Sequence, residues 1–227
     1  MRPWVWLALP VTVGVYLAFV WLHARRASTF TLPVLGTLVA ITSVLALTGS
    51  DLDAYGTMTW PLQWMLGPAT VALAVPLYRQ RATLRAHLAR VLVAVSIGSL
   101  VGAASAIGLA RILGLSRTWI ASLAPKSVTT PVAMPLAERL GGEPSLAAAA
   151  VLVTGILGLV FGAPLLDRVG VRSALARGLA YGVGAHGVGT MRALQEGEEA
   201  GAAGGVAMVL AAIFTSIVVG ALVRLLG

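Results

Sequence analysis

The 227 residues are 58% hydrophobic and only 11% charged, whereas soluble domains carry about 25% charged residues. This composition excludes a water-soluble fold and indicates a membrane protein. The formal charge of +8 comes mainly from arginines at the ends of apolar segments, which membrane topology and lipid headgroups explain better than nucleic acid does. Cysteine is absent, so disulfides, thiolate metal sites and cysteine nucleophiles are excluded.

Apolar runs long enough to cross a bilayer recur along the whole chain. They predict an all-α polytopic membrane protein with about seven transmembrane helices and one re-entrant or broken-helix segment. We expect one integral membrane domain, 1–227, in which 1–30 is a retained N-terminal helix rather than a cleaved signal peptide. The expected spans lie near 4–22, 31–48, 60–78, 88–113, 145–166, 173–193 and 203–226.

The charged connections between these spans predict the topology. Arginines cluster at 25–26, 79–90 and 168–177, and acidic residues dominate 51–53 and 196–199. The positive-inside rule assigns the three arginine connections to the cytoplasm. That assignment holds if 117–140 enters and leaves on the outer side as a re-entrant hairpin, broken at Pro125 and Pro131. The alternatives are a complete span that leaves one basic connection outside, or a missed helix elsewhere.

A weak internal repeat relates two proline-interrupted segments. Residues 69–77 (ATVALAVPL) and 128–136 (VTTPVAMPL) share threonine, alanine, proline and leucine at one common offset. With the hairpin topology the two copies run in opposite directions, so repeat-like units near 60–113 and 117–170 form an inverted repeat. Many secondary transporters build a midplane site from such repeats. A chance match is the alternative, because these residue types are common here.

Lys126 is the only lysine of the chain and lies in a polar run between two apolar stretches. Burying an ammonium at bilayer depth costs roughly 2.5–3.5 kcal/mol, so such a residue indicates a functional site. Broken helices also expose N–H groups that suit an anion. The hypothesis is a pocket for a small organic anion, and the alternative is that Lys126 extends to the interface. The expected hydrogen-bonding residues are Ser127, Thr129, Thr130 and Thr70, and the expected helix breaks are Pro68, Pro125 and Pro131.

A glycine-rich stretch, 177–192, forms a second constellation. Its formal GxGxxG from Gly182 to Gly187 lacks the βαβ context and the acidic residue of a dinucleotide site. Such glycines in a membrane helix permit either close packing or an unwound, ligand-facing backbone. His186 either carries a proton or binds a carboxylate, or it only bonds a neighbouring helix. Thr190 is counted with the substrate-binding residues. The expected gating or ion-pair residues are Arg177, Arg192 and Glu196.

No metal-ligand spacing, no nucleophile beside a base and no pair of carboxylates within the membrane is found in the sequence. We therefore expect neither an enzyme nor a resident cofactor. Coupling of transport to H⁺ or Na⁺ remains open.

These stretches together resemble the LrgB/CidB family. The resemblance rests on residues 66–74 (LGPATVALA), 125–131 (PKSVTTP), 176–179 with 186–190 (HGVGT) and 192–199 (RALQEGEE), and it extends from about residue 31 to the C-terminus. It implies antiholin-like or holin-like proteins that affect murein hydrolase activity and autolysis, often beside a small LrgA/CidA-type membrane partner. It also implies carboxylate transport, because a related plastid protein translocates glycolate and glycerate and some bacterial pairs are linked to pyruvate uptake.

The chemistry favours a secondary transporter of small monocarboxylates, of the glycolate, glycerate, lactate or pyruvate class, with a midplane site made of broken helices. The alternative is an antiholin-like or holin-like regulator that acts with a small LrgA/CidA-type partner. The expected partners are a small organic anion, the lipid bilayer and a second copy in a dimer, without nucleic acid. The expected location is the bacterial cytoplasmic (inner) membrane.

Overall fold

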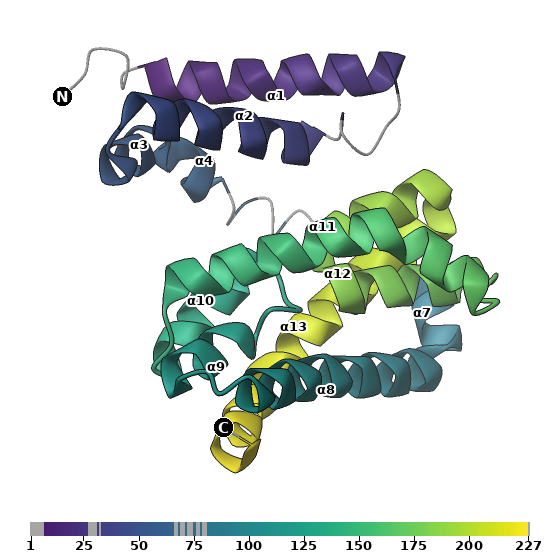
Figure 1. The fold of residues 1–227 in the computed structure, drawn as a ribbon. Helices are drawn as coiled ribbons and strands as arrows, with labels where there is room; N and C mark the ends of the chain where they lie inside the picture. The colour runs from purple at the N-terminus through teal and green to yellow at the C-terminus, as the bar shows by residue number, and fades with distance from the viewer. Residues whose placement is uncertain are drawn as a thin grey trace. The chain divides into compact units, whose positions relative to one another are not determined.

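The computed structural model describes residues 7–26, 31, 33–65, 68, 71, 75, 78 and 81–226. These residues form helices joined by turns, with no strand among them, which confirms the all-α prediction (Figure 1). The chain divides into two compact units, Met1–Val71 and Ala72–Gly227, and each is described by itself. The prediction of one integral membrane domain is not tested by this division.

The first unit contains two longer helices followed by two short ones. They are α1 (Ala8–Arg25), α2 (Pro33–Thr48), α3 (Leu52–Met58) and α4 (Trp60–Trp64). Helices α1 and α2 pack closely, because a Cβ at Gly36 would collide with the ring of Phe19. The hydroxyl groups of Thr12 and Tyr55 lie 2.8 Å apart and connect α1 to α3.

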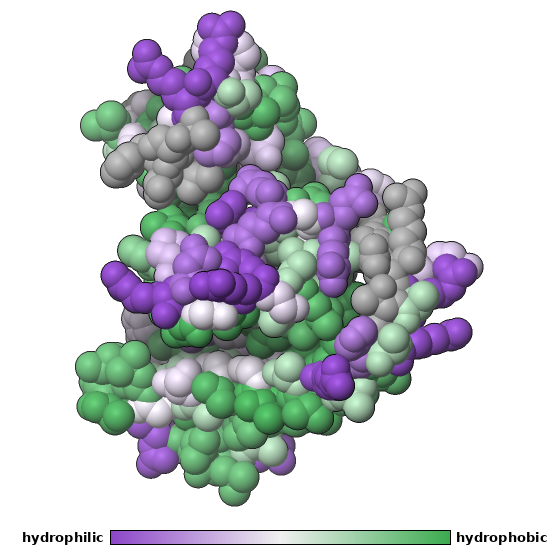
Figure 2. Space-filling model, turned by 90° about the vertical axis from the view of Figure 1, so that its right-hand side faces the viewer, coloured by the Kyte–Doolittle hydropathy of each residue, from purple (hydrophilic) through white to green (hydrophobic). Residues whose placement is uncertain are grey.

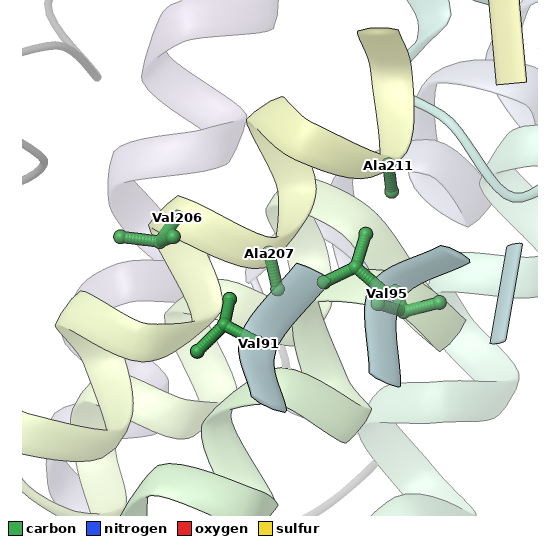
Figure 3. Packing of buried hydrophobic residues seen from close by; sticks show 6 residues of the cluster. Val91, Val95, Val206, Ala207 and Ala211 are labelled. Carbon is green, nitrogen blue, oxygen red and sulfur yellow. The ribbon is translucent and has the colours of Figure 1, made fainter. Parts of the chain in front are cut away.

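The second unit is built around three long helices, α8 (Leu88–Ile112), α11 (Pro144–Arg168) and α13 (Glu198–Leu226), preceded by the short α7 (Arg81–Ala86). Three further helices lie between them: α9 (Arg117–Leu123), α10 (Thr130–Arg139) and α12 (Ala174–Glu196). Valines of α8 pack against α13 in a buried cluster of Val91, Val95, Val183, Val206, Ala207 and Ala211 (Figure 3). This contact joins the first half of α8 to the first half of α13.

Four helices in the described part of the chain are long and apolar enough to cross a membrane: α1, α8, α11 and α13. Four of the seven expected spans, near 4–22, 88–113, 145–166 and 203–226, correspond to these helices, and the full number of seven is not confirmed. The expected span at 31–48 is the 16-residue α2, which is shorter than these four. Only the start of the expected span at 60–78 is described as α4, because most residues from 66 to 80 lie outside the described part.

The expected span at 173–193 is wrong. Helix α12 is interrupted at Ala185 (φ −138°, ψ 17°) and His186 (φ 43°, ψ −131°), where the backbone leaves the helical region. The chain reverses there, because Arg177 near the start of α12 forms an ion pair with Glu196 at its end. The segment is consequently a helical hairpin and not a crossing helix.

This reversal also corrects the predicted topology. A complete span would put the acidic connection 196–199 at the end opposite to the arginines of 168–177, but the Arg177–Glu196 contact brings the two together. Figure 2 looks onto the end of the second unit where α7 and the α11–α12 connection lie in Figure 1. Hydrophilic side chains gather there beside large hydrophobic areas, as at a boundary between headgroups and hydrocarbon.

Candidate functional site

The first hairpin consists of α9, a turn at 124–129, and α10. The Oγ of Ser116 accepts a hydrogen bond from the backbone N–H of Trp119 and caps α9, and Pro131 occupies the first turn of α10. The chain that follows α10 returns to α9, since the backbone N–H of Glu143 donates to Oγ of Ser122 at 2.7 Å. Arg117 and Arg139 line one cavity of about 390 Å³. The segment 117–140 thus begins and ends at the same side, as the hairpin expectation required.

The second hairpin is α12 itself, with its turn at Ala185 and His186. Its two arms touch, because a Cβ at Gly189 would collide with the carbonyl oxygen of Tyr181 and the methyl group of Ala185. The φ of His186 lies in the left-handed region, which L-residues rarely adopt. Glycine at 189 removes the side chain that would otherwise separate the two arms.

The two hairpins lie at opposite ends of α13. The first hairpin packs near its end, where Ile120 and Ala124 share a buried cluster with Val219. The second packs near its start, where a Cβ at Gly182 would collide with the carbonyl oxygen of Gly204. The hairpins therefore enter the unit from opposite ends of the long helices.

The turns of the two hairpins approach each other beside the first half of α11. Val128, in the first turn, belongs to a buried cluster with Val151 of α11. His186, in the second turn, is buried, and its Nε2 lies 2.9 Å from the carbonyl oxygen of the same Val151. Both turns consequently lie close to one residue, although 58 positions separate Val128 from His186 in the chain.

Helix α8 contacts both hairpins as well. A Cβ at Gly98 would meet the side chain of Val183 in the second hairpin, and one at Gly102 would lie 3.0 Å from Oγ of Ser127 in the first. Ser99 between them is buried, and its Oγ has no hydrogen-bond partner in the described structure. The two glycines let both hairpins approach the same stretch of α8.

Lys126 lines a cavity of about 720 Å³ beside these turns. The cavity is bounded by α11, by the first arm of the second hairpin and by the end of α9. Nζ of Lys126 lies 3.5 Å from Oγ of Ser127, and Lys126 makes no ion pair with any described residue. The ammonium is therefore available to an anion.

The predicted hydroxyl groups do not all gather around Lys126. Ser127 is buried beside it, but Thr129 is the N-cap residue of α10 without a side-chain capping bond, and Thr130 starts that helix. Neither threonine lines the cavity. Thr70 lies outside the described residues.

The predicted prolines have different positions. Pro125 is fully buried in the first turn, where the helix is interrupted as predicted. Pro131 lies in the first turn of α10, a position that proline tolerates, so it starts a helix rather than breaking one. Pro68 is described as helical and exposed, but its flanking residues are outside the described part.

Thr190 is not free to bind a substrate through its proton, since its Oγ1 donates to the carbonyl oxygen of His186 at 2.9 Å. This bond links the second arm of the hairpin to its turn. Together with the contact between His186 and Val151, it fixes the left-handed turn against α11.

Charged side chains close the base of the second hairpin. Nε of Arg177 lies 2.6 Å from Oε2 of Glu196, and its Nη1 lies 2.6 Å from Oδ1 of Asp167 at the end of α11. The hydroxyl of Tyr181 donates to Oε1 of Glu196 at 2.7 Å. Arg192 adds a longer ion pair with Glu196, at 3.4 Å and four positions along the arm. The hydrogen bond from Arg177 holds the pKa of the Glu196 carboxyl below its usual range.

Sequence reasoning missed parts of this site. It did not include Asp167 among the ion-pair residues, whereas Asp167 binds Arg177. It did not identify Tyr181, whose only signal was its place four positions after Arg177. It mistook the turn at His186 for the middle of a span, although the surrounding glycines permitted an unwound backbone. No cluster of metal-binding side chains is found within the described residues.

Comparison with known proteins gives a family match. Residues 12–225 match the model of the LrgB-like family. The chain belongs to this family. The predicted resemblance is confirmed, and the match includes most of α1, whereas the resemblance was expected to begin at about residue 31.

Curated relatives of this LrgB-like chain cover most of its length. An uncharacterized protein, YxaC, of Bacillus subtilis is 36% identical over 91% of this chain and 90% of its own. The holin-like protein CidB of Staphylococcus epidermidis is 31% identical over 85% and 84%. The antiholin-like protein LrgB of Bacillus mycoides is 29% identical over 74% and 73%. No solved structure matches the LrgB-like chain. The match to the LrgB-like family and the four long apolar helices together indicate a multi-pass membrane protein.

Proposed function

We propose that this LrgB-like protein is a secondary transporter of small monocarboxylates, of the glycolate, glycerate, lactate or pyruvate class. The observation that carries the proposal is the meeting of two opposed helical hairpins, with Lys126 in one turn and His186 in the other. Transporters commonly build a midplane site from discontinuous helices of this kind. The proposal involves no catalytic step and no resident cofactor.

The opposed hairpins suit alternating access. Each hairpin has its base at one end of α13 and its turn beside the first half of α11, near Val151. Movement of one hairpin would open the space between the turns toward one side, while the other hairpin keeps the second side closed. The ion pairs of Arg177 with Glu196 and Asp167 would hold the second hairpin closed at its base.

A repeated order of elements supports the same proposal. Helix α8 has 25 residues and precedes the first hairpin, and α11 has 25 residues and precedes the second. The two helix–hairpin units run in opposite senses and so form a candidate inverted repeat. Its limits differ from the units near 60–113 and 117–170. Those earlier units stay a prediction, because most of residues 69–77 lie outside the described part.

The unpaired ammonium of Lys126 indicates that the transported species is an anion. Lys126 lies beside a mostly apolar cavity without an acidic partner among the described residues, so a bound carboxylate would offset the cost of its burial. The positive end of the α10 dipole, at Thr129 and Thr130, also favours an anion, although neither threonine lines the cavity. His186 is the proposed proton carrier if transport is coupled to H⁺.

Uptake of radiolabelled glycolate and pyruvate into proteoliposomes tests this function. We expect saturable uptake that is lost in Lys126→Ala and retained in Arg172→Ala, which removes an exposed cation outside the cavity. An imposed proton gradient shows whether transport is coupled to H⁺. Equal saturable uptake by the wild type and Lys126→Ala would contradict the assigned site.

The names of the relatives favour a second candidate function. Two of the relatives are called holin-like and antiholin-like, which fits a regulator of murein hydrolase activity and autolysis acting with a small LrgA/CidA-type membrane partner. A pore predicts non-saturable release of an unrelated dye from the same proteoliposomes, whereas a transporter retains the dye while it accumulates its substrate. We propose the bacterial cytoplasmic membrane as the location and a homodimer as the assembly in either case.

A further inference from the structure

Three arginines line one cavity at the base of the first hairpin. Arg117 begins α9, Arg139 ends α10, and Arg224 lies in the last turn of α13. The cavity has a volume of about 390 Å³, and no acidic side chain is found among the described residues that line it. Leu140 and Val223 also line it, and both pack against the buried cluster that joins α9 to α13. The cavity shares no lining residue with the larger one beside α11.

The three guanidinium groups have no partner in the described part of the chain. None of them forms an ion pair, a side-chain hydrogen bond or a stacking contact with a described residue. Glu138 precedes Arg139 without pairing with it, and Glu143 accepts a hydrogen bond from Ser145. Like charges around one cavity repel each other. An anion from outside the chain would offset this repulsion.

The base of the second hairpin shows how an anion joins two arms. There Arg177, near the start of the hairpin, binds Glu196 at its end. The first hairpin has arginine at both corresponding places, Arg117 at its start and Arg139 at its end. A carboxylate of the chain therefore closes the second base, whereas the first base can be closed in this way only by an anion supplied from outside.

Membrane topology does not account for these arginines. The positive-inside rule assigns the cations of 168–177, at the base of the second hairpin, to the cytoplasm. Arg117, Arg139 and Arg224 lie at the opposite end of the long helices, where the rule predicts few cations (Figure 1). A role in binding an anion explains their position, and topology does not.

We propose that Arg117, Arg139 and Arg224 bind a phosphate group, which bridges α9 and α10 to α13. A guanidinium group presents planar N–H donors that match the oxygens of a phosphate. Ile112 and Leu225, at the same ends of α8 and α13, are exposed, as side chains are where lipid headgroups meet hydrocarbon. The phosphate group belongs to an anionic phospholipid or is free phosphate.

Thermal unfolding of the full chain in nanodiscs tests this site. The wild type should melt about 6 °C higher in phosphatidylcholine with about 20% phosphatidylglycerol than in phosphatidylcholine alone, because each arginine gains from an anionic lipid. A second arm adds inorganic phosphate to phosphatidylcholine nanodiscs, with chloride at equal ionic strength as its control. A shift with phosphatidylglycerol alone identifies the lipid headgroup as the ligand, and a shift with inorganic phosphate identifies free phosphate.

A triple variant removes the proposed site without removing a contact inside the protein. Arg117→Gln, Arg139→Gln and Arg224→Gln together should lose the shift, and each single change should lose about a third of it. In phosphatidylcholine alone the triple variant should melt no lower than the wild type, because the three side chains are exposed and their mutual repulsion is removed. Hydrogen exchange measures the bridge, since bound phosphate should slow the exchange of amides in 117–140 of the wild type only.

A matched control removes the same charge elsewhere. Arg90→Gln, Arg168→Gln and Arg172→Gln together replace three exposed arginines outside the cavity, and this variant should keep the shift. An equal loss of the shift in both triple variants would reflect general surface charge and overturn the site. The absence of a shift with either source of phosphate would overturn it as well. A shift without slower exchange in 117–140 would overturn the bridge between the hairpin and α13.

Discussion

Nε of Arg177 lies 2.6 Å from Oε2 of Glu196, although nineteen positions of one helical segment separate the two residues. A continuous helix would place them nearly 30 Å apart. The ion pair therefore requires the reversal at Ala185 and His186, and it fixes which charged connections share one end of the molecule.

The topology can be measured directly, because the chain contains no cysteine. Single exposed cysteines at Arg172→Cys and Glu199→Cys should be labelled by a membrane-impermeant maleimide from the same side. Glu138→Cys, at the end of α10 before α11 crosses, should be labelled from the other side. Labelling of residues 172 and 199 from opposite sides would show that α12 crosses the membrane and would contradict the hairpin.

The ion pair at the base of the second hairpin should stabilise the fold. We expect Arg177→Ala and Glu196→Gln each to lower the free energy of unfolding by about 2 kcal/mol, because each leaves partly buried polar atoms without a partner. In a double-mutant cycle the two changes should couple by roughly 0.5–3 kcal/mol. Arg172→Ala, which removes an exposed arginine, is the control. Fully additive effects in thermal unfolding would show that the contact contributes nothing.

The same carboxylate makes the hairpin base sensitive to acid. Arg177 lowers the pKa of Glu196, so folding favours the ionised form. The stabilisation is complete above the ordinary glutamate pKa of about 4.3 and is lost as the pH falls through the lower pKa of the folded state. Between pH 7 and pH 5 the contribution of Glu196 to the melting temperature should therefore stay constant. Below about pH 4 the difference between wild type and Glu196→Gln should shrink.

Substitution of His186 should show an unusual order of stability. In a regular helix alanine is more stable than glycine by about 1 kcal/mol. At the φ of 43° observed here, alanine keeps the strain of the left-handed turn and glycine removes it. Both variants lose the contact with the carbonyl oxygen of Val151. We expect His186→Gly to unfold at a higher temperature than His186→Ala, whereas the reverse order would indicate a regular helix at this position.

Glycines of the second hairpin should differ in their tolerance of a methyl group. A Cβ at Gly182 would collide with backbone atoms of α13, and one at Gly184 would meet nothing within 4 Å. Gly182→Ala should cost about 1–3 kcal/mol through overpacking, while Gly184→Ala should stay within about 0.5 kcal/mol of the wild type. Equal stabilities of the two variants, measured by thermal unfolding, would rule out the close contact with α13.

The parts of the fold that the sequence predicts are those with a local signal. The long apolar runs of α8, α11 and α13 identify membrane helices, and the interruption at Pro125 and Lys126 identifies the first hairpin. The second hairpin lacks a proline, and its turn depends on contacts made far along the chain, at Val151 and at Glu196. Local hydropathy does not record such contacts. The cavity wall was missed for the same reason, because an apolar face on α11 looks like any lipid-facing face.

The shallow depth of the hairpins has an electrical consequence. Each arm of the second hairpin has about ten residues and rises about 15 Å, roughly half of a 30 Å hydrocarbon core. A charge that moves between one side of the membrane and the turns therefore crosses about half of the transmembrane potential. For an unaccompanied ion this amounts to about 1.2 kcal/mol per 100 mV, half the value for a full crossing. A carboxylate that binds together with one proton would feel no such force, so the voltage dependence of uptake reports the stoichiometry of the bound complex.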